Sequence, residues 1–342
     1  MCKPASMIVT QGRIYWHPLT NSHEDIIEYF SLPDDPQKIV RVEISPKNMD
    51  FSSPLEQWSY ETYQDEFPDW YDPRVEELAV RGELKKWADT FIFRSGHYEQ
   101  SEGERFYVGK CRAVINGGKG HFYDNSTGEV RGGVALFYDR STGEIHGGLG
   151  HFHGKSTGEI HSGNGSFWDN STGEVHGGEG YFWDSSTGEV HGGFGVFRDK
   201  STGEIHGGKG YFRDNSTGEI HGGVARFYDS STGEVHGGSG HFYDNSTGEV
   251  HGGYGIFWDS STGEVYGGGG VFNASSTGEI HNGGGSFSNN STGKVHRGEG
   301  IFWDKSTGEI HGGYCDFFNN STGEVHGGEV IFHDNSTRLE TK

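Results

Sequence analysis

Apolar and polar positions follow a fixed 15-residue order over the last two thirds of the chain. A phenylalanine recurs every 15 residues from Phe122 to Phe332, fifteen times in all, and a Val or Ile lies eight residues after it in the fourteen full copies. The residue directly after each Phe varies among Trp, Tyr, Arg, His, Asn, Ser and Phe. Constant apolar positions beside variable ones indicate an inside and an outside, built from stacked copies of one unit.

The pattern within each copy predicts β structure rather than helix. The consensus is G-x-G-x-F-[W/Y/R]-D-x-S-T-G-E-[V/I]-H-G, which is rich in Gly and β-branched residues and has no apolar residues at helical spacing. The D-x-S-T-G segment is typical of a tight turn with a left-handed glycine. If these five residues form the loop, Phe122 lies opposite Val130, and Glu, His and the variable residue share the other face.

Two architectures satisfy this pattern. One is a stacked array of β-hairpins with two antiparallel strands per repeat. The other is a β-solenoid with one coil per repeat and a rise of ~4.8 Å. The turn chemistry favours the hairpin array. In either case, burying one Phe and one Val or Ile contributes about 4–6 kcal/mol, whereas ordering fifteen residues costs about 20 kcal/mol, so a single copy is not stable alone.

The first 116 residues have a different composition and are predicted to form a small α+β domain. All eight prolines lie within residues 4–73, and only five of the 60 glycines precede residue 117. We therefore expect a head or capping domain of residues 1–116, an all-β repeat array of residues 117–337 and a charged tail of residues 338–342. The open ends of the array would be strand edges capable of self-association.

Local signals place the elements of the head. A hairpin is expected over residues 8–16, with its turn at Gln11-Gly12. Ser22 and Asp25 form a capping pattern ahead of a short helix. The further expected elements are a strand over residues 39–44, a helix beginning at Asp72-Pro73 and a strand over residues 106–115 that leads into the array.

Net charge and the absence of targeting signals limit the classes of partner and the location that the sequence predicts. Lys plus Arg number 27 against 49 Asp plus Glu, a net charge of −22. This balance argues against nucleic acid and anionic membrane surfaces, which require a basic face. The chain has no 18-residue apolar run and its first seven residues lack the apolar core of a signal peptide. The sequence predicts a cytoplasmic protein, and no motif for a cofactor is present.

Two resemblances add to this picture. The head carries YWH at 15–17, SHEDII at 22–27, LPDD at 32–35, VRVEISP at 40–46 and FPDW at 67–70. Residues 12–92 thereby resemble a family of uncharacterised phage and bacterial proteins, in which a similar head precedes short-period repeats of other sequence. That resemblance implies a modular head with an expandable repeat, encoded by a phage or a bacterium, and no known activity. The segment GEVHGGFGVF at 188–197 is similar to part of a MORN repeat, a scaffold module, but differs in period and by an extra Gly.

The variable column after Phe is one candidate binding surface. Exposed aromatic stripes commonly mark surfaces that bind sugars, peptides or partner sheets. The alternative is that these rings cover the second face of a thin sheet. The candidate residues are Tyr123, Tyr138, Trp168, Trp183, Tyr228, Tyr243, Trp258 and Trp303.

The repeated Glu-x-His pair is a candidate metal site, because imidazole and carboxylate are ligands for zinc or copper. In a solenoid the His column would be spaced ~4.8 Å and adjacent rings could share a metal, whereas in a hairpin array the spacing would be about 10 Å. A solvated ladder of packed, hydrogen-bonded His is the favoured interpretation. The candidate ligands are Glu174, His176, Glu189, His191, Glu204 and His206.

Catalytic signals are confined to the head. His17, His23, Glu24 and Asp25 are clustered ionisable residues, but the two acids also suit the first turn of a helix. The sequence therefore predicts a non-enzymatic structural or interaction protein, an elongated β-repeat rod with a multivalent surface and an unknown protein or glycan partner. The alternatives are a metal- or carbohydrate-binding array, and an enzymatic head with the repeats as a spacer.

Overall fold

The computed structural model describes residues 4–339. The chain divides into two compact units. The first contains residues up to Gly143 together with 148–150, and the second contains 144–147 together with 151 onward. Among the helices of residues 4–339, none combines the length and the apolar character needed to cross a membrane.

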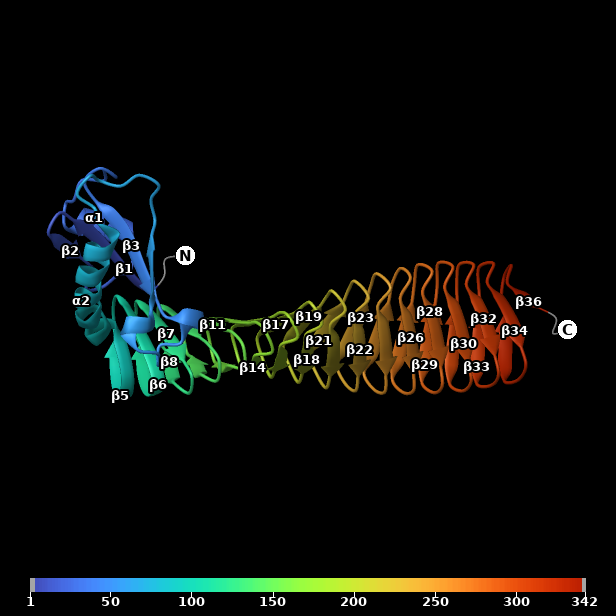
Figure 1. Ribbon diagram of the computed structural model, residues 1–342. Helices are drawn as coiled ribbons and strands as arrows, with labels where there is room; N and C mark the ends of the chain where they lie inside the picture. The colour runs from blue at the N-terminus through green and yellow to red at the C-terminus, as the bar shows by residue number, and fades with distance from the viewer. Residues whose placement is uncertain (1–3, 340–342) are drawn as a thin grey trace. The chain divides into compact units, whose positions relative to one another are not determined.

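The head within the first unit is a four-stranded sheet in the order β2-β1-β3-β4 with two α-helices (Figure 1). Its antiparallel pairing brings Thr10 opposite Arg13, which confirms the predicted hairpin. Ser22 caps the first helix by accepting a hydrogen bond from the Asp25 amide, and Asp72 caps the second, so both predicted helix starts are confirmed. The elements are β1 (Ala5–Thr10), β2 (Arg13–Tyr15), α1 (His23–Tyr29), β3 (Val40–Ser45), two 3-10 turns (Lys47–Met49 and Leu55–Gln57), β4 (Ser59–Thr62) and α2 (Pro73–Phe91).

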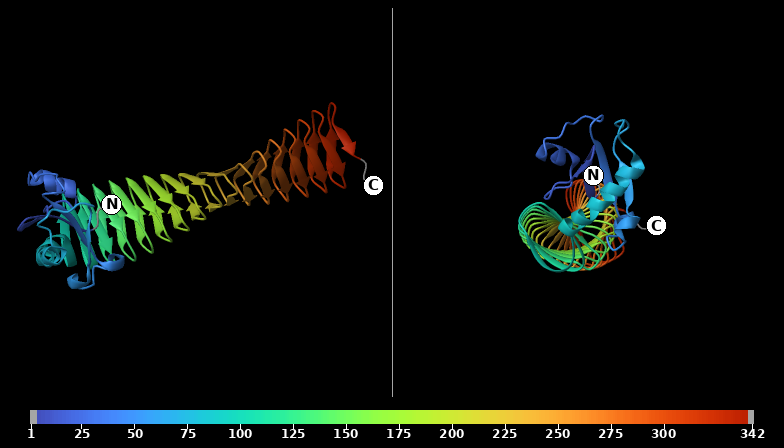
Figure 2. Two further views of the ribbon diagram at one scale, coloured as in Figure 1. Left: turned by 45° about the horizontal axis from the view of Figure 1, so that its top comes forward. Right: turned by 60° about the vertical axis from the view of Figure 1, so that its left-hand side comes forward.

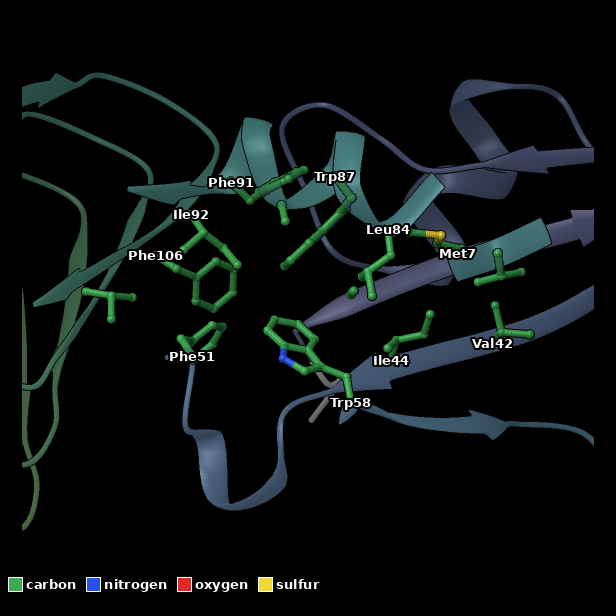
Figure 3. Close-up of a cluster of buried hydrophobic side chains, with 14 of the residues drawn as sticks. Met7, Val42, Ile44, Phe51, Trp58, Leu84, Trp87, Phe91, Ile92 and Phe106 are labelled. Carbon is green, nitrogen blue, oxygen red and sulfur yellow. The ribbon is translucent and has the colours of Figure 1, made fainter. Parts of the chain in front are cut away.

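An aromatic core holds the head together. Trp58 and Trp87 are almost fully buried and meet edge to face, with ring centroids 6.4 Å apart. Trp87 also stacks on Phe91 at 5.0 Å. Figure 3 shows these rings converging with Phe51 and Phe106 between α2 and the strands. The large buried area explains why this non-repetitive part of the chain can form its own core.

Parallel pairing between residues 15 positions apart, which defines a coil, begins in the chain before the repeated sequence does. In β6 (Glu104–Ile115), which includes the predicted strand over residues 106–115, residues pair in parallel with partners 15 positions later, Glu104 with Lys119 and Arg112 with Thr127. The strand before it, β5 (Ile92–Gln100), also pairs with β6 in parallel. The coils thus start within the predicted head of residues 1–116. The coil strands that follow are β7 (Lys119–Tyr123), β8 (Thr127–Val130), β9 (Val134–Phe137), β10 (Thr142–Ile145) and β11 (Leu149–Phe152).

The second unit is a parallel β-solenoid with two strands per coil. Strands ending in the repeated Phe pair in parallel with their counterparts one coil away, and strands with the sequence T-G-[E/K]-[V/I] do the same. We call these the Phe ladder and the Glu ladder. The Phe ladder contains β13 (Asn164–Phe167), β15 (Glu179–Phe182), β17 (Phe194–Phe197), β19 (Lys209–Phe212), β21 (Val224–Phe227), β23 (Ser239–Phe242), β25 (Tyr254–Phe257), β27 (Gly269–Phe272), β29 (Gly284–Phe287), β31 (Glu299–Phe302), β33 (Tyr314–Phe317) and β35 (Glu329–Phe332).

The Glu ladder alternates with it along the chain. Its strands are β12 (Thr157–Ile160), β14 (Thr172–Val175), β16 (Thr187–Val190), β18 (Thr202–Ile205), β20 (Thr217–Ile220), β22 (Thr232–Val235), β24 (Thr247–Val250), β26 (Thr262–Val265), β28 (Thr277–Ile280), β30 (Thr292–Val295), β32 (Thr307–Ile310), β34 (Thr322–Val325) and β36 (Thr337–Leu339). The predicted tail thus begins inside β36, and residues 340–342 lie outside the described residues.

The solenoid alternative is therefore confirmed, and the preference for a hairpin array was wrong. The turn between the two strands is tight, as predicted: Asp184 and Ser185 both have positive φ, and the Ser186 amide donates to the Trp183 carbonyl. It leads the chain into the other ladder rather than back beside the same strand. Parallel pairing of identical sequences places Phe on Phe, and Phe182 and Phe197 stack at 4.6 Å.

Glycine allows the two ladders to interlock. A Cβ on Gly188 of the Glu ladder would lie 2.3 Å from the ring of Phe182, and a Cβ on Gly180 of the Phe ladder would lie 2.5 Å from Val175. Each ladder thus offers a glycine where the other inserts its large side chain. The prediction that the glycine of D-x-S-T-G is left-handed was wrong, because Gly188 is a strand residue whose missing side chain makes room for a ring.

The remaining constant positions close the coil. Ser186 is fully buried beside the turn, and its hydroxyl donates to the Phe167 carbonyl at 3.3 Å. At the opposite turn Gly193 has a φ of +78°, and a Cβ there would lie 2.5 Å from the Gly178 carbonyl one coil earlier. Figure 2 shows successive coils of the second unit rotating gradually about the stacking direction, as expected for twisted strands.

Candidate functional site

The outer side of the Glu ladder carries three rows of polar side chains. In the strand T-G-E-V, alternation turns Gly188 and Val190 inward and Thr187 and Glu189 outward. His191 follows at the start of the next turn and is exposed. We call the Thr, Glu and His rows of the second unit the Thr–Glu–His face. Sequence reasoning placed Thr in the loop. The alternation of T-G-E-V is the signal that could have placed it on the strand.

Parallel register stacks identical residues in each row. Glu174, Glu189 and Glu204 are successive partners in the Glu ladder. The ring centroids of His176 and His191 are 5.1 Å apart and the planes differ by 10°. This is the close spacing expected for a solenoid, about half of that expected for a hairpin array.

Glutamates in this ladder lie between two histidines, one from the same coil and one from the next. A carboxylate oxygen of Glu189 lies 3.5 Å from Nε2 of His191 and 3.9 Å from Nε2 of His206. For Glu219 the corresponding distances are 3.6 Å to His221 and 3.0 Å to His236. The six predicted metal ligands, Glu174 to His206, thus lie together on three consecutive coils.

Four groups of glutamate and histidine side chains have their potential metal-ligand atoms close together. In each group the potential ligand atoms all lie within 4.8 Å of one another. Within residues 4–339 these groups are Glu144, His146 and His161; Glu219, Glu234 and His236; Glu279, His281 and His296; and Glu309, His311 and His326.

Two natural exceptions interrupt the rows. Tyr266 replaces a histidine, stacks on His251 at 5.0 Å and on His281 at 4.5 Å, and donates a hydrogen bond of 2.6 Å to Glu264. That bond raises the pKa of Tyr266 to about 12. Together with the bond from His281, it lowers the pKa of the Glu264 carboxyl. Lys294 replaces a glutamate and lies 3.7 Å from Glu309.

A shallow groove lies over the later coils of the Thr–Glu–His face. It has a volume of about 370 Å³ and is lined by Thr, Gly and Glu positions of the Glu-ladder strands β26 to β32, with Lys294 among them, and by Glu324 and Leu339. Because the glycines between the Thr and Glu rows have no side chains, the backbone forms its floor. The groove can therefore accept an extended, hydrogen-bonding ligand.

The predicted aromatic column does not share this face. The residue after each Phe extends the Phe ladder, as the bond from the Trp183 amide to the Phe167 carbonyl shows, so it projects away from the Glu ladder. Tyr123 is buried in the core of the first unit, and Tyr138 packs against that core. The other six predicted residues, Trp168, Trp183, Tyr228, Tyr243, Trp258 and Trp303, are half-buried.

Stacking covers ring faces in much of this column. Trp168 and Trp183 lie 5.0 Å apart with planes 4° from parallel, and Arg198 covers Trp183 at 5.0 Å. Tyr228 and Tyr243 stack in the same way at 4.9 Å. A sugar binds to the face of an aromatic ring, and stacking occupies faces of these four rings. The column is thus better suited to packing than to binding glycans.

Comparisons of the chain with family models, with curated proteins and with solved structures find no match. The resemblances of the head to phage and bacterial proteins and of the repeats to MORN units stay predictions.

The ionisable residues of the head each have a separate structural partner. The His23 ring is buried and its Nε2 lies 2.9 Å from the Val42 carbonyl. Glu24 accepts from Ser22, and a hydrogen bond from its own backbone amide is the main reason why its pKa is lowered. Asp25 accepts from the Thr20 hydroxyl at 2.7 Å, and His17 packs edge-on against Tyr29. The contact of His23 is that of core packing, those of Glu24 and Asp25 lie at the start of the helix, and that of His17 is with an exposed ring.

Proposed function

We propose that this is a non-enzymatic protein whose Thr–Glu–His face is a periodic interaction surface. One observation carries the proposal. Outward Thr occurs in all fifteen copies, Glu in thirteen of the fourteen full copies and His in twelve. Over the same copies, the outward residue before each Phe takes eight identities, which are His, Leu, Ser, Tyr, Val, Arg, Ile and Asp.

Packing accounts for the constant inward residues but not for the constant outward ones. Recent duplication of the copies would have kept both outer faces alike, yet only the Glu ladder is constant. Exposed ion pairs contribute only about 0–1 kcal/mol each, so stability is a weak reason to retain them. A partner that contacts the same rows in each coil would explain the difference between the two faces.

The partner that fits is itself repetitive. Rows of carboxylates, hydroxyls and imidazoles at about 5 Å suit a protein or glycan with a matching repeat, and a row of carboxylates disfavours nucleic acid and anionic membranes. An intracellular location in a phage or bacterial system belongs to the same proposal. Fractionation of host cells tests that part.

The test separates stability from interaction. One variant of the full chain replaces Glu189, Glu204, Glu219 and Glu234 by Gln. Its matched control replaces Val196, Tyr211, Arg226 and His241, which project from the Phe ladder over the same coils, by Gln. Urea unfolding in the presence of EDTA compares their free energies of unfolding with that of the unmodified protein.

We expect the glutamate variant to be no less stable than the control variant, since the carboxylates are exposed. Retention of the Glu row would then require a reason outside folding. If the glutamate variant is several kcal/mol less stable than the control, the ion-pair ladder itself explains the constant rows and the proposed interaction surface is wrong.

Self-association through a strand edge is a second candidate, favoured by the last coil. Phe332 and Val325 are only partly buried, whereas Phe302 and Ile310 are fully buried. Within residues 4–339 the strands β35 and β36 pair with β33 and β34 of the preceding coil. Sedimentation velocity over a hundredfold range of concentration tests this. A single species that does not change with concentration excludes association in solution.

A further inference from the structure

The Glu and His rows place nitrogen and oxygen ligands at one repeated spacing. We propose that the Thr–Glu–His face binds divalent transition-metal ions, Zn²⁺ or Cu²⁺, each held by one glutamate and two histidines from successive coils. This inference deepens the proposed function, because it names a ligand for the same face.

The donor set suits these metals. Neutral imidazole nitrogen with one carboxylate is a ligand combination that proteins use for zinc, with a water molecule completing four-coordination. Cu²⁺ binds nitrogen and oxygen ligands more tightly than Zn²⁺ does. Ca²⁺ requires six to eight oxygen ligands, which one carboxylate between two imidazoles does not supply.

The geometry already brings the ligands close. In the group of Glu279, His281 and His296 all three potential ligand atoms lie within 4.8 Å of one another, and Glu279 is hydrogen-bonded to His296. Zinc bonds of about 2.0–2.1 Å in a tetrahedral site require ligand atoms about 3.3 Å apart. The three side chains are between 33% and 36% exposed, so small rotations can close this gap without opening the core.

Sharing of histidines sets the number of ions. A histidine such as His206 lies within 4 Å of both Glu189 and Glu204, so an ion on every coil would require each ring to bind two metals. Ions on alternate coils avoid this. Eight histidines follow one another from His146 to His251 and four from His281 to His326, with Tyr266 between the two runs. At two histidines per ion, these runs hold four and two ions, six in all.

Each of these six pairs has its own glutamate. The predicted sites are Glu144 with His146 and His161, Glu174 with His176 and His191, Glu204 with His206 and His221, Glu234 with His236 and His251, Glu279 with His281 and His296, and Glu309 with His311 and His326. Three of the six coincide with groups whose ligand atoms are already gathered.

The experiment measures bound metal directly. The EDTA-treated and desalted full-length protein is dialysed against increasing ZnCl₂, CuCl₂ or CaCl₂, and bound metal is measured by atomic emission. One variant replaces His281, His296, His311 and His326 by Gln. The matched control replaces His151, His153, His241 and His333, which lie on or directly after β11, β23 and β35, by Gln. Circular dichroism verifies that both variants keep the solenoid.

We expect saturation near six Zn²⁺ or Cu²⁺ ions per chain and no saturable Ca²⁺ binding. The number of bound Zn²⁺ or Cu²⁺ ions should fall by about one third in the variant at His281, His296, His311 and His326, and should not fall in the control. Electron paramagnetic resonance of the Cu²⁺ form should show coupling to two nitrogens. Absence of saturable zinc and copper binding, or an equal loss in both variants, would overturn the proposal. Because the glutamate test of the proposed function is made in EDTA, failure here leaves that result unaffected.

Discussion

At the scale of single residues, the two interior glycine positions of a coil differ in how readily they accept a larger residue. The Phe-ladder glycine is replaced by Ala135, Ala225 and Cys315, which are fully buried, and by Val330 in the last coil. The Glu-ladder glycine is present in all fourteen full copies. The reason is the nearest neighbour: a Cβ on Gly188 of the Glu ladder would meet the Phe182 ring at 2.3 Å, whereas a Cβ on Gly180 of the Phe ladder would meet Val175 at 2.5 Å and the Phe182 ring only at 2.9 Å.

A matched pair of substitutions in one coil tests this difference. Gly188→Ala forces a methyl group against the Phe182 ring and should lower the free energy of unfolding by about 1–3 kcal/mol. Gly180→Ala should cost clearly less, since other coils already accommodate Ala there. Urea denaturation of the two variants measures both values. Equal costs would contradict the interlocking of ring and glycine.

A buried contact between a carboxylate and an imidazole in the first unit predicts a pH dependence. The Glu104 carboxylate lies 2.7 Å from Nε2 of His121 and 3.1 Å from Lys119. Burial alone would raise the pKa of Glu104, but these two partners lower it. Burial lowers the pKa of His121. As the pH falls through the ordinary pKa of either group, the unfolded chain takes up a proton more readily than the folded chain does. The free energy of unfolding therefore decreases as the pH falls, first through His121 and then through Glu104.

His121→Gln keeps a donor for Glu104 but removes the titrating ring. We expect the unmodified protein to lose more stability between pH 7 and pH 5 than this variant does. The loss due to Glu104, which occurs below pH 4.5, should remain. Urea unfolding at a series of pH values measures this, with the exposed His97→Gln as the control. Parallel pH profiles for all three proteins would count against a buried neutral His121.

At the scale of the element, the coil is the unit of the second half of the chain. In the Phe ladder each residue pairs with the residue 15 positions later. Removing one whole coil therefore leaves the same kinds of residue in contact at the new junction. Backbone hydrogen bonds run from coil to coil, as between the Thr202 amide and the Ser186 carbonyl. Stability then depends on neighbouring coils matching.

Two deletions test the coil as a unit. Removal of residues 198–212 joins Phe197 to Arg213, which takes the place of Arg198, and should leave the circular dichroism spectrum and the melting temperature nearly unchanged. Removal of residues 198–204 joins Phe197 to Ile205 and shifts every later residue out of register. We expect the second deletion to unfold at a much lower temperature. Equal melting temperatures would be incompatible with register-dependent stacking.

At the scale of the whole molecule, stability comes from two different sources. The head has a mixed aromatic core that combines residues far apart in the chain, such as Phe51, Trp87 and Phe106. The second unit has no such centre; each coil is stabilised by the coils beside it. Local opening should therefore be unevenly distributed along the second unit, with the terminal coil the weakest.

Amide hydrogen exchange measures this distribution. Among the described residues, those at 329–339 pair only with the preceding coil and leave Phe332 partly exposed, so they should exchange fastest among the coils of the second unit. Strands β20 to β26, with coils on both sides, should exchange slowest. Uniform protection from β20 to β36 would indicate a stabilising contact at the final coil.

The sequence alone determined the features that depend on local spacing. The 15-residue period, the inward Phe and Val or Ile, the helix starts at Ser22 and Asp72 and the strand over residues 39–44 all follow from periodicity, capping and alternation. It also led to the conditional statement that His rings in a solenoid would stack at about 4.8 Å, which His176 and His191 satisfy to within a few tenths of an ångström.

Only the tertiary structure decided how the strands pair and therefore which columns share a face. Antiparallel hairpins and parallel coils use the same inside–outside alternation, and the difference lies in which strand receives each backbone hydrogen bond. Parallel pairing separated the aromatic column from the Glu and His rows and gathered Glu279, His281 and His296. The burial of Tyr123 likewise depends on a non-repetitive neighbour, Phe51, that no feature of the repeat specifies.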